Sequence, residues 1–203
     1  MNDRKRFAPA TARNREAILD VLREWIAPGA AVLEIASGTG EHAVFLAPRL
    51  EVASWQPTDP EADSRASIDA WRDESGVETV RPSLALDVTQ PWPAFDAKPD
   101  AIVCVNMIHI SPWGVTSALF DGASAALSAS GVLYLYGPYK RDGRHTSPSN
   151  ESFDASLRAR NAEWGVRDLG DVTLAARARG FELARVTEMP ANNLSVIFTR
   201  GPT

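Results

Sequence analysis

Three acidic residues lie at or near the ends of three successive apolar segments of this sequence. Glu34 stands near the end of the first segment, Asp59 closes the second and Asp87 closes the third. Because the carboxyl ends of neighbouring parallel strands meet at one edge of an α/β sheet, these carboxylates are expected to converge on one crevice. A carboxylate inside an apolar strand costs free energy without a partner, and Asp59 has the spacing at which such folds hold a ribose hydroxyl. The acids therefore indicate a ligand site.

A turn of small residues, Ser37 to Gly40, separates the first apolar segment from a predicted helix. Small residues let the backbone approach a ligand closely, and the start of a helix presents N–H groups without partners. A tight turn without a ligand explains the two glycines equally well. The neighbouring carboxylates favour a binding site.

The periodicity of the apolar residues predicts helices and strands in alternation. Helices are expected over 14–27, 41–50, about 60–71, 115–129, 153–162 and 169–178, and strands over 31–36, 52–57, within 77–86, and over 101–106, 131–137, 181–188 and 194–199. Such alternation is typical of an α/β fold, a doubly wound, mostly parallel, seven-stranded sheet with helices on both faces. The short connection 189–193 predicts that the last two strands form an antiparallel C-terminal hairpin.

Two segments fall outside this alternation. Residues 1–11 form a polar arm that is expected to be extended and is a candidate cover for the active site. The polar stretch 138–150 is a candidate active-site loop, because loops of this length inside compact domains are usually functional or disordered. A chain of 203 residues is long enough for one α/β domain, so a single domain over 1–203 is expected.

The composition argues against several classes of protein. A formal net charge of −5 disfavours a nucleic-acid partner. The N-terminus lacks the apolar stretch of a signal peptide and no run is apolar enough to span a bilayer, which predicts a cytoplasmic protein without a membrane partner. The single cysteine, Cys104, excludes an intrachain disulfide and any multi-cysteine metal site. The three histidines show no metal-ligand spacing, so no metal is expected.

The string from Glu34 to Gly40, E-I-A-S-G-T-G, resembles the E/D-x-G-x-G-x-G signature of class I S-adenosylmethionine-dependent methyltransferases, with Ala36 in place of the first glycine. The resemblance covers nearly the whole chain, including the final hairpin. More narrowly, the chain is similar to the poorly characterised methyltransferase-like 26 family. The shared strings are A-x-x-R-N (10–14), L-E-I-A-S-G-T-G-E-H (33–42), N-M-I-H-I-S-P-W (106–113), G-P-Y (137–139), S-N-E-S-F-D (149–154), W-G-V-R-D (164–168) and M-P-A-N-N-L (189–194).

This resemblance implies S-adenosyl-L-methionine as the cofactor and methyl transfer as the reaction. Glu34 and the backbone of Ala36, Ser37, Gly38, Thr39 and Gly40 would face the methionine portion of the cofactor. Asp59 would accept hydrogen bonds from the ribose hydroxyls, and Asp87 one from the adenine amino group. Val88 would add a backbone contact, and Asn106 would flank the amino-acid moiety through its carbonyl.

The acceptor side is expected around the fourth strand and the later loops. His109 and Tyr139 are the catalytic candidates, and His109 suits a general base or an orienting group because its ordinary pKa lies near neutrality. A structural role for this histidine is the alternative. Further residues are expected to line the acceptor pocket, unless they serve as caps, turns or core: Asn14, Trp113, Asn150, Asp154, Arg167 and Asn193.

The expected acceptor is a small molecule, of unidentified structure. No N-P-P-[YF] motif follows the fourth strand, where the sequence is Asn106-Met107-Ile108-His109, and this disfavours methylation of nucleic-acid amino groups.

Two other functions stay open at this point. The segment Gly38 to Ala43 also fits G-x-G-x-x-A, with Asp59 as the ribose acid, so an NAD(P)-dependent oxidoreductase is an alternative. Glu34 and the closing hairpin favour the methyltransferase. A non-catalytic protein that retains the fold is the other alternative, since fold does not determine function. The sequence leaves the oligomeric state open.

Overall fold

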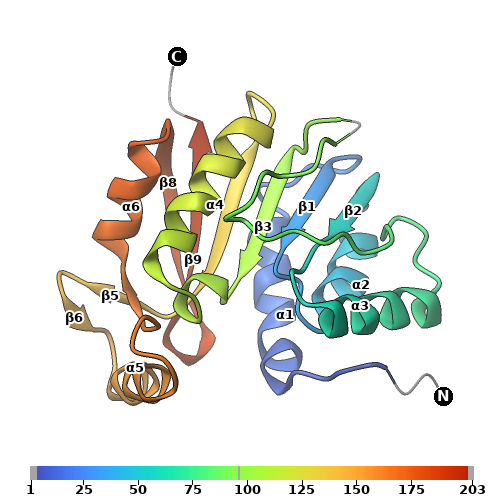
Figure 1. Cartoon of the computed structure of the whole chain (residues 1–203). Coiled ribbons are helices and arrows are strands. Elements are labelled where there is room, and N and C mark those ends of the chain that lie inside the picture. Colours follow the sequence, from blue (N-terminus) through green and yellow to red (C-terminus); the bar gives the residue numbers. More distant parts are fainter. Residues whose placement is uncertain (1–3, 96, 201–203) are drawn as a thin grey trace.

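A six-stranded sheet forms the centre of the molecule. The structure is a computed structural model that describes residues 4–95 and 97–200 (Figure 1). The strands follow the order β2-β1-β3-β4-β9-β8, in which the first four are parallel and β9 is antiparallel to both of its neighbours. Their bounds are Ala31–Ile35 (β1), Ser54–Pro57 (β2), Ala101–Val105 (β3), Val132–Gly137 (β4), Phe181–Met189 (β8) and Asn193–Arg200 (β9). The mostly parallel sheet with an antiparallel C-terminal hairpin is confirmed.

Helices cover both faces of the sheet, because successive side chains of a strand point to opposite faces. Val32 of β1 packs in one core cluster with residues of α1 and α2, whereas Leu33 packs in a second cluster with residues of α4 and α6. Figure 1 shows α4 and α6 together in front of the sheet. The helices are Pro9–Leu22 (α1), Glu41–Arg49 (α2), Ala62–Ser75 (α3), Trp113–Ala126 (α4), Pro148–Arg160 (α5) and Leu169–Arg177 (α6).

The strand expected within 77–86 does not form. This segment runs beside β2 but makes only two isolated parallel bridges to it, Trp55 with Val80 and Thr58 with Leu84. Pro82 lies between the two bridges and has no N–H to donate to a ladder, which explains the interruption. The sheet therefore has six regular strands and an irregular edge, instead of the seven strands that the sequence predicts.

The stretch 138–150 is also more regular than a loop. It forms a small hairpin, Tyr139–Arg141 (β5) and Arg144–His145 (β6), and β5 also pairs with Arg167–Asp168 (β7). Asp142 and Gly143 both adopt positive φ angles, 53° and 75°, which is the turn chemistry that Asp-Gly favours in hairpins. Ser147 then caps α5 by accepting a hydrogen bond from the backbone N–H of Asn150.

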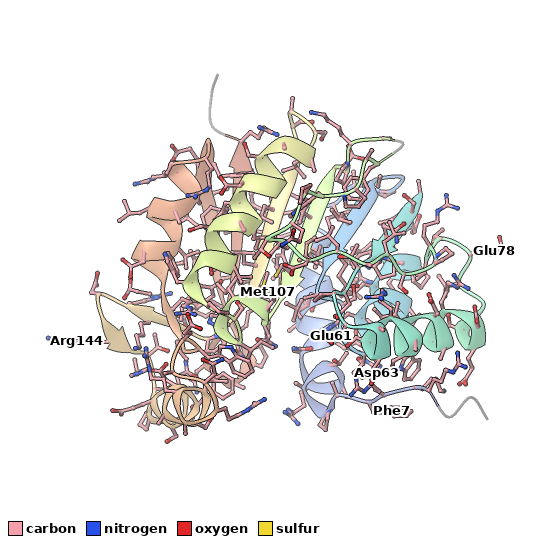
Figure 2. All side chains as sticks on the ribbon, in the orientation of Figure 1. Phe7, Glu61, Asp63, Glu78, Met107 and Arg144 are labelled. Atoms are coloured by element: carbon pink, nitrogen blue, oxygen red, sulfur yellow. The ribbon has the colours of Figure 1, made fainter. Side chains whose placement is uncertain are left out.

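The N-terminal arm reaches helical structure earlier than expected, since α1 begins at Pro9, a residue suited to the first turn of a helix. Residues 4–8 run past α3, and Figure 2 shows Phe7 below that helix. Phe7 contacts Trp71 edge to face at 5.2 Å, and Trp71 donates a hydrogen bond to the carbonyl of Arg6. The N–H of Ala8 bonds to Glu41 at the start of α2. The arm is thus fastened beside the turn that follows β1.

None of the helices within residues 4–95 and 97–200 is long and apolar enough to cross a bilayer.

The packing of α2 against α3 leaves no space for a side chain at Gly40. A Cβ at this position would lie 2.6 Å from the Cα of Ile68, whereas a Cβ at Gly29 would meet nothing within 4 Å. Both glycines have left-handed φ angles, 92° and 81°. Gly29→Ala should therefore cost about 1 kcal/mol through backbone strain alone, and Gly40→Ala about 2 kcal/mol more through the overlap.

Urea unfolding of the two alanine variants measures this difference directly. Equal losses of stability would show that α2 and α3 can separate without cost, contrary to the packing described here.

Candidate functional site

The turn between β1 and α2 is tightly curled. Ala36, Gly38 and Gly40 all have left-handed φ angles, of 54°, 60° and 92°. Alanine adopts this conformation only at a cost of about 1 kcal/mol, so the surrounding contacts must hold it. Two of these contacts are a hydrogen bond from the N–H of Ser37 to the carbonyl of Thr58 and one from the N–H of Gly40 to the carbonyl of Ser37.

Asp59, just beyond the end of β2, fastens this turn. Its Oδ2 accepts a hydrogen bond from the N–H of Gly38 at 3.0 Å, and its Oδ1 accepts one from the N–H of Glu61 at 3.0 Å. Burial raises the pKa of Asp59, and these two amide bonds oppose that rise. Each carboxylate oxygen can accept a further hydrogen bond.

The turn is open on the side of Gly38, because no atom lies within 4 Å of the position that a side chain there would take. Backbone in this shape can approach a ligand closely. With Asp59 held beside it, the turn fits a group that carries hydroxyls.

Glu34 does not present its carboxylate at this opening. The residue is 2% exposed, and its Oε2 accepts a hydrogen bond from Trp55 Nε1 at 3.0 Å. Its carbonyl accepts a bond from the Thr58 hydroxyl at 2.7 Å. Burial raises the pKa of Glu34 from 4.5 to about 7. Glu34 therefore supports the base of the turn from inside the sheet.

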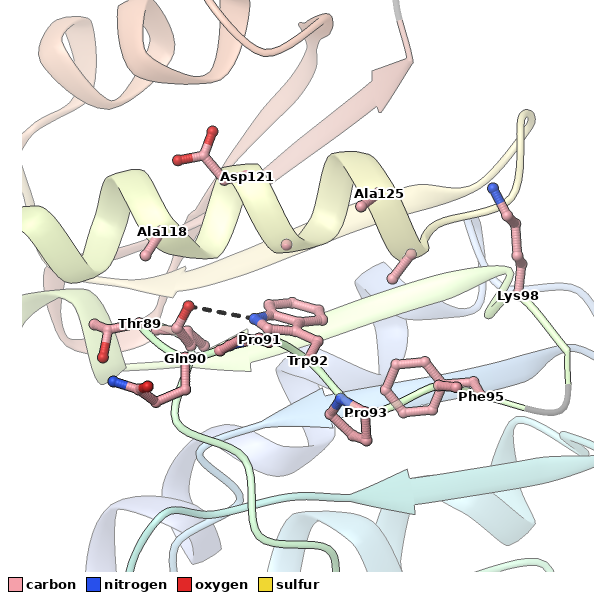
Figure 3. Close-up of a pocket in the computed structure, with 14 residues that line it drawn as sticks. Thr89, Gln90, Pro91, Trp92, Pro93, Phe95, Lys98, Ala118, Asp121 and Ala125 are labelled. Atoms are coloured by element: carbon pink, nitrogen blue, oxygen red, sulfur yellow. Dashed lines mark hydrogen bonds between the residues drawn. The ribbon is translucent and has the colours of Figure 1, made fainter.

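Asp87 and Val88 follow the irregular edge segment. Asp87 is exposed, and its Oδ1 accepts hydrogen bonds from the N–H and the hydroxyl of Thr89. Val88 is buried, and its carbonyl accepts a bond from Trp92 Nε1 at 3.3 Å. Figure 3 shows this tryptophan against α4, where a side chain at Gly122 would overlap its ring. These contacts shape a separate, largely apolar pocket of about 690 Å³ between 88–98 and α4.

A second pocket, of about 390 Å³, lies at the carboxyl ends of β3 and β4. We call it the asparagine pocket, because it gathers four asparagines from four different parts of the chain. Its lining residues are Ala10, Arg13, Asn14, Asn106, Tyr136, Pro138, Ser149, Asn150, Phe153, Pro190, Ala191 and Asn193. The structure thus brings together four of the residues expected from the sequence, Asn14, Asn106, Asn150 and Asn193.

The sequence predicts only the four asparagines of this lining, and Tyr136 is one of the lining residues that sequence reasoning missed. Tyr136 belongs to an unbroken apolar segment, G-V-L-Y-L-Y-G, and such a segment predicts a residue of the hydrophobic core. The signal that could have found it is its place, one residue before the glycine that ends β4, at the edge of the sheet where ligands bind.

His109 and Tyr139 do not line the asparagine pocket. His109 is 1% exposed, and burial lowers the pKa of its imidazole from 6.5 to about 3. Its ring meets the buried ring of Tyr139 edge to face, with centroids 5.1 Å apart. Among the described residues, neither ring nitrogen of His109 and not the Tyr139 hydroxyl has a hydrogen-bond partner. A Cβ at Gly137 would lie 2.3 Å from Nε2 of His109 and 3.1 Å from Oδ1 of Asn106. The absence of a side chain at Gly137 therefore lets both of these side chains approach the backbone of β4.

Asp154 lies outside the pocket, in a network of ion pairs. Its carboxylate contacts Lys140 at 3.0 Å, His145 at 3.3 Å and Arg158 at 3.3 Å, and it accepts a hydrogen bond from the N–H of Val166. Burial alone would raise the pKa of Asp154, but Lys140, Arg158 and the N–H of Val166 together outweigh burial and hold this pKa below its usual range. The network joins α5 to the β5–β6 hairpin.

Arg167 and Trp113 also lie outside the asparagine pocket. The Arg167 guanidinium donates to the carbonyls of Ile108, Ser111 and Glu163, which fastens the short 3₁₀ helix η1 (Met107–His109). It also lies 5.8 Å from the ring centre of Trp113. Together they line a different, open pocket of about 720 Å³.

Within the described residues, no three histidine, cysteine, aspartate or glutamate side chains are grouped as a metal site would require.

The buried carboxylate of Glu34 predicts a pH dependence of stability. The pKa is about 7 in the folded protein and 4.5 without burial, so the folded state binds the proton more tightly. Stability should therefore fall as the pH rises from about 4.5 to about 7, by at most about 3.5 kcal/mol, since each pKa unit corresponds to about 1.4 kcal/mol. Glu34→Gln keeps an oxygen for Trp55 and cannot ionise, so this loss should disappear.

Urea unfolding of both proteins at pH 5 and pH 8 tests the expectation, because all other titrating groups are shared. An identical change between the two pH values in both proteins would contradict it.

Comparison with solved structures identifies the fold. An O-methyltransferase family protein from Burkholderia thailandensis superimposes with a TM-score of 0.80 at 14% identity, over 95% of this chain and 57% of that protein. A putative sarcosine dimethylglycine methyltransferase from Galdieria sulphuraria gives 0.74 at 16% identity, over 95% and 87%. The O-methyltransferase NcsB1 from neocarzinostatin biosynthesis, solved with S-adenosylmethionine and a naphthoic acid, gives 0.75 at 13% identity, over 94% and 54%.

The chain therefore has the fold of S-adenosylmethionine-dependent methyltransferases, and it spans little more than half the length of two of these proteins. In sequence, the family described as "Protein of unknown function (DUF938)" matches residues 5–200. The chain belongs to the DUF938 family.

Proposed function

We propose that this protein is an S-adenosylmethionine-dependent methyltransferase that acts on a small-molecule acceptor. The observation that carries the proposal is the turn between β1 and α2, curled by three left-handed residues and fastened to Asp59 through the N–H of Gly38. This arrangement leaves open space beside Gly38 at the carboxyl edge of the sheet, where α/β folds bind ligands. The narrower similarity to the methyltransferase-like 26 family is part of the same proposal.

The cofactor, when bound, supplies a methyl group activated on a sulfonium sulfur. Asp59 would accept hydrogen bonds from the ribose hydroxyls, and the backbone from Ala36 to Gly40 would surround the methionine portion. Asp87 and the backbone of Val88 would meet the adenine. Glu34 would act indirectly, because its carboxylate is bonded to Trp55 inside the sheet.

The asparagine pocket is the proposed acceptor site. Asn14, which lines this pocket, makes a hydrogen bond with His42 of α2. Because α2 begins at the turn after β1, the proposed acceptor and cofactor sites share a wall. Asn106 follows β3 and would contact both molecules. The walls from α1 and α5 would orient the acceptor and exclude water, which is the main contribution that a protein makes to a displacement of this kind.

His109 is proposed as a positioning group. Its lowered pKa, about 3, makes the imidazole neutral at physiological pH but a weak proton acceptor. The pocket lining holds no stronger base among the described residues. An acceptor whose reacting atom needs no strong base to remove a proton suits this site best.

Calorimetry with S-adenosylhomocysteine tests the proposal. Asp59→Ala should weaken binding at least tenfold, because hydrogen bonds to a charged group contribute about 1.5–3 kcal/mol. Asp59→Asn, which keeps an acceptor for the N–H of Gly38, should lose less. Asp100→Asn is the matched control, since this carboxylate also bonds a backbone N–H, that of Ala31, but at the opposite end of β1.

Binding of NAD(H) without binding of S-adenosylhomocysteine would replace the proposal by an oxidoreductase. Binding of S-adenosylhomocysteine with no methyl transfer to any fraction of a cell extract would favour a non-catalytic protein instead.

A further inference from the structure

The asparagine pocket contains a buried tyrosine that lies among asparagines. Tyr136 is 2% exposed, and it lines the pocket together with Asn14 and Asn193. Burial raises the pKa of Tyr136 above its ordinary value. The phenol is therefore protonated at neutral pH.

The side chain of Asn14 is oriented by His42. The Nε2 of His42 lies 2.9 Å from Oδ1 of Asn14, and burial together with the charge of Arg15 lowers the pKa of the imidazole to about 4. An amide oxygen only accepts hydrogen bonds, so Nε2 carries the proton of this neutral ring. The amino group of Asn14 takes no part in this bond.

A protonated phenol can donate a hydrogen bond, and an amide amino group can only donate. Tyr136 and Asn14 therefore line the pocket with groups that can donate to a ligand.

The charge of the pocket points to the kind of ligand. None of the described lining residues is acidic, and the one charged member is Arg13, an exposed residue of α1. Within residues 4–95 and 97–200, Arg13 makes no ion pair. The pocket therefore offers donors and one positive charge, without a carboxylate to bind an ammonium group.

The size of the pocket, about 390 Å³, suits a small molecule, and Phe153, Pro138 and Pro190 give it apolar walls. We infer that the acceptor is a small molecule bearing a carboxylate, and that the hydroxyl of Tyr136 binds this carboxylate with Arg13 at the rim. The inference rests on the proposed function. It assigns Tyr136 as a specificity-determining residue.

The test uses three probes of similar size, benzoate, benzamide and benzylamine, added to the complex with S-adenosylhomocysteine and followed by calorimetry. Benzoate should bind about tenfold more tightly than benzamide, and benzylamine more weakly than either. Tyr136→Phe should weaken benzoate about tenfold and leave the affinity for S-adenosylhomocysteine unchanged.

Tyr134→Phe is the matched control, because it removes a hydroxyl from the same strand that bonds Ser195 in the interior, away from the pocket. It should leave benzoate binding unchanged. Arg13→Gln changes an exposed side chain and so should fold normally, and it should weaken benzoate several-fold, more at low than at high salt.

The outcomes separate the two proposals. Failure to bind S-adenosylhomocysteine at all would refute the proposed function. Normal binding of S-adenosylhomocysteine, with benzoate no tighter than the other probes or unaffected by Tyr136→Phe and Arg13→Gln, would overturn only the carboxylate inference.

Discussion

The hydrogen bond from the N–H of Gly38 to Asp59 is the contact on which the site depends. It joins the turn after β1 to the end of β2, and two further bonds beside it, Thr58 N–H to Glu34 and Ser37 N–H to Thr58, extend the pairing of these strands past their last residues. This continued pairing helps to hold Ala36 in its left-handed conformation. The same contacts determine where α2 begins. His42 of α2 then makes a hydrogen bond with Asn14, which lines the asparagine pocket.

A consistent electrostatic feature runs through both sites. Burial favours the neutral form of Glu34, His42 and Tyr136, and side-chain hydrogen bonds hold Glu34 and His42. Neutral groups can be buried at the sheet edge without the large desolvation cost of isolated charges. The exposed charges beside these groups are those of Arg13 and Asp87.

Much of the fold could be predicted from the sequence, because it rests on local patterns. The alternation of β1, which sends Val32 and Leu33 to opposite faces, and the short 189–193 connection are readable from the chain alone. The errors arose where a single residue or a distant contact decides. Pro82 breaks an otherwise regular strand, Asp142-Gly143 turns an apparent loop into a hairpin, and Trp55 draws the Glu34 carboxylate inward. The sequence predicted the four asparagines of the pocket but not Tyr136, because an apolar pattern does not show which end of a strand lies at a pocket.

The segment between β4 and α6 helps to shape the asparagine pocket through one buried carboxylate. Asp154 binds Lys140 and His145 of the hairpin and so holds α5 against it. Asn150, one turn earlier on α5, then reaches the C-terminal hairpin and donates to the carbonyl of Asn192 at 2.9 Å. The pocket wall is thus positioned by Asp154, a residue that does not line the pocket. Changes in 138–168 can therefore alter the shape of the asparagine pocket from outside it.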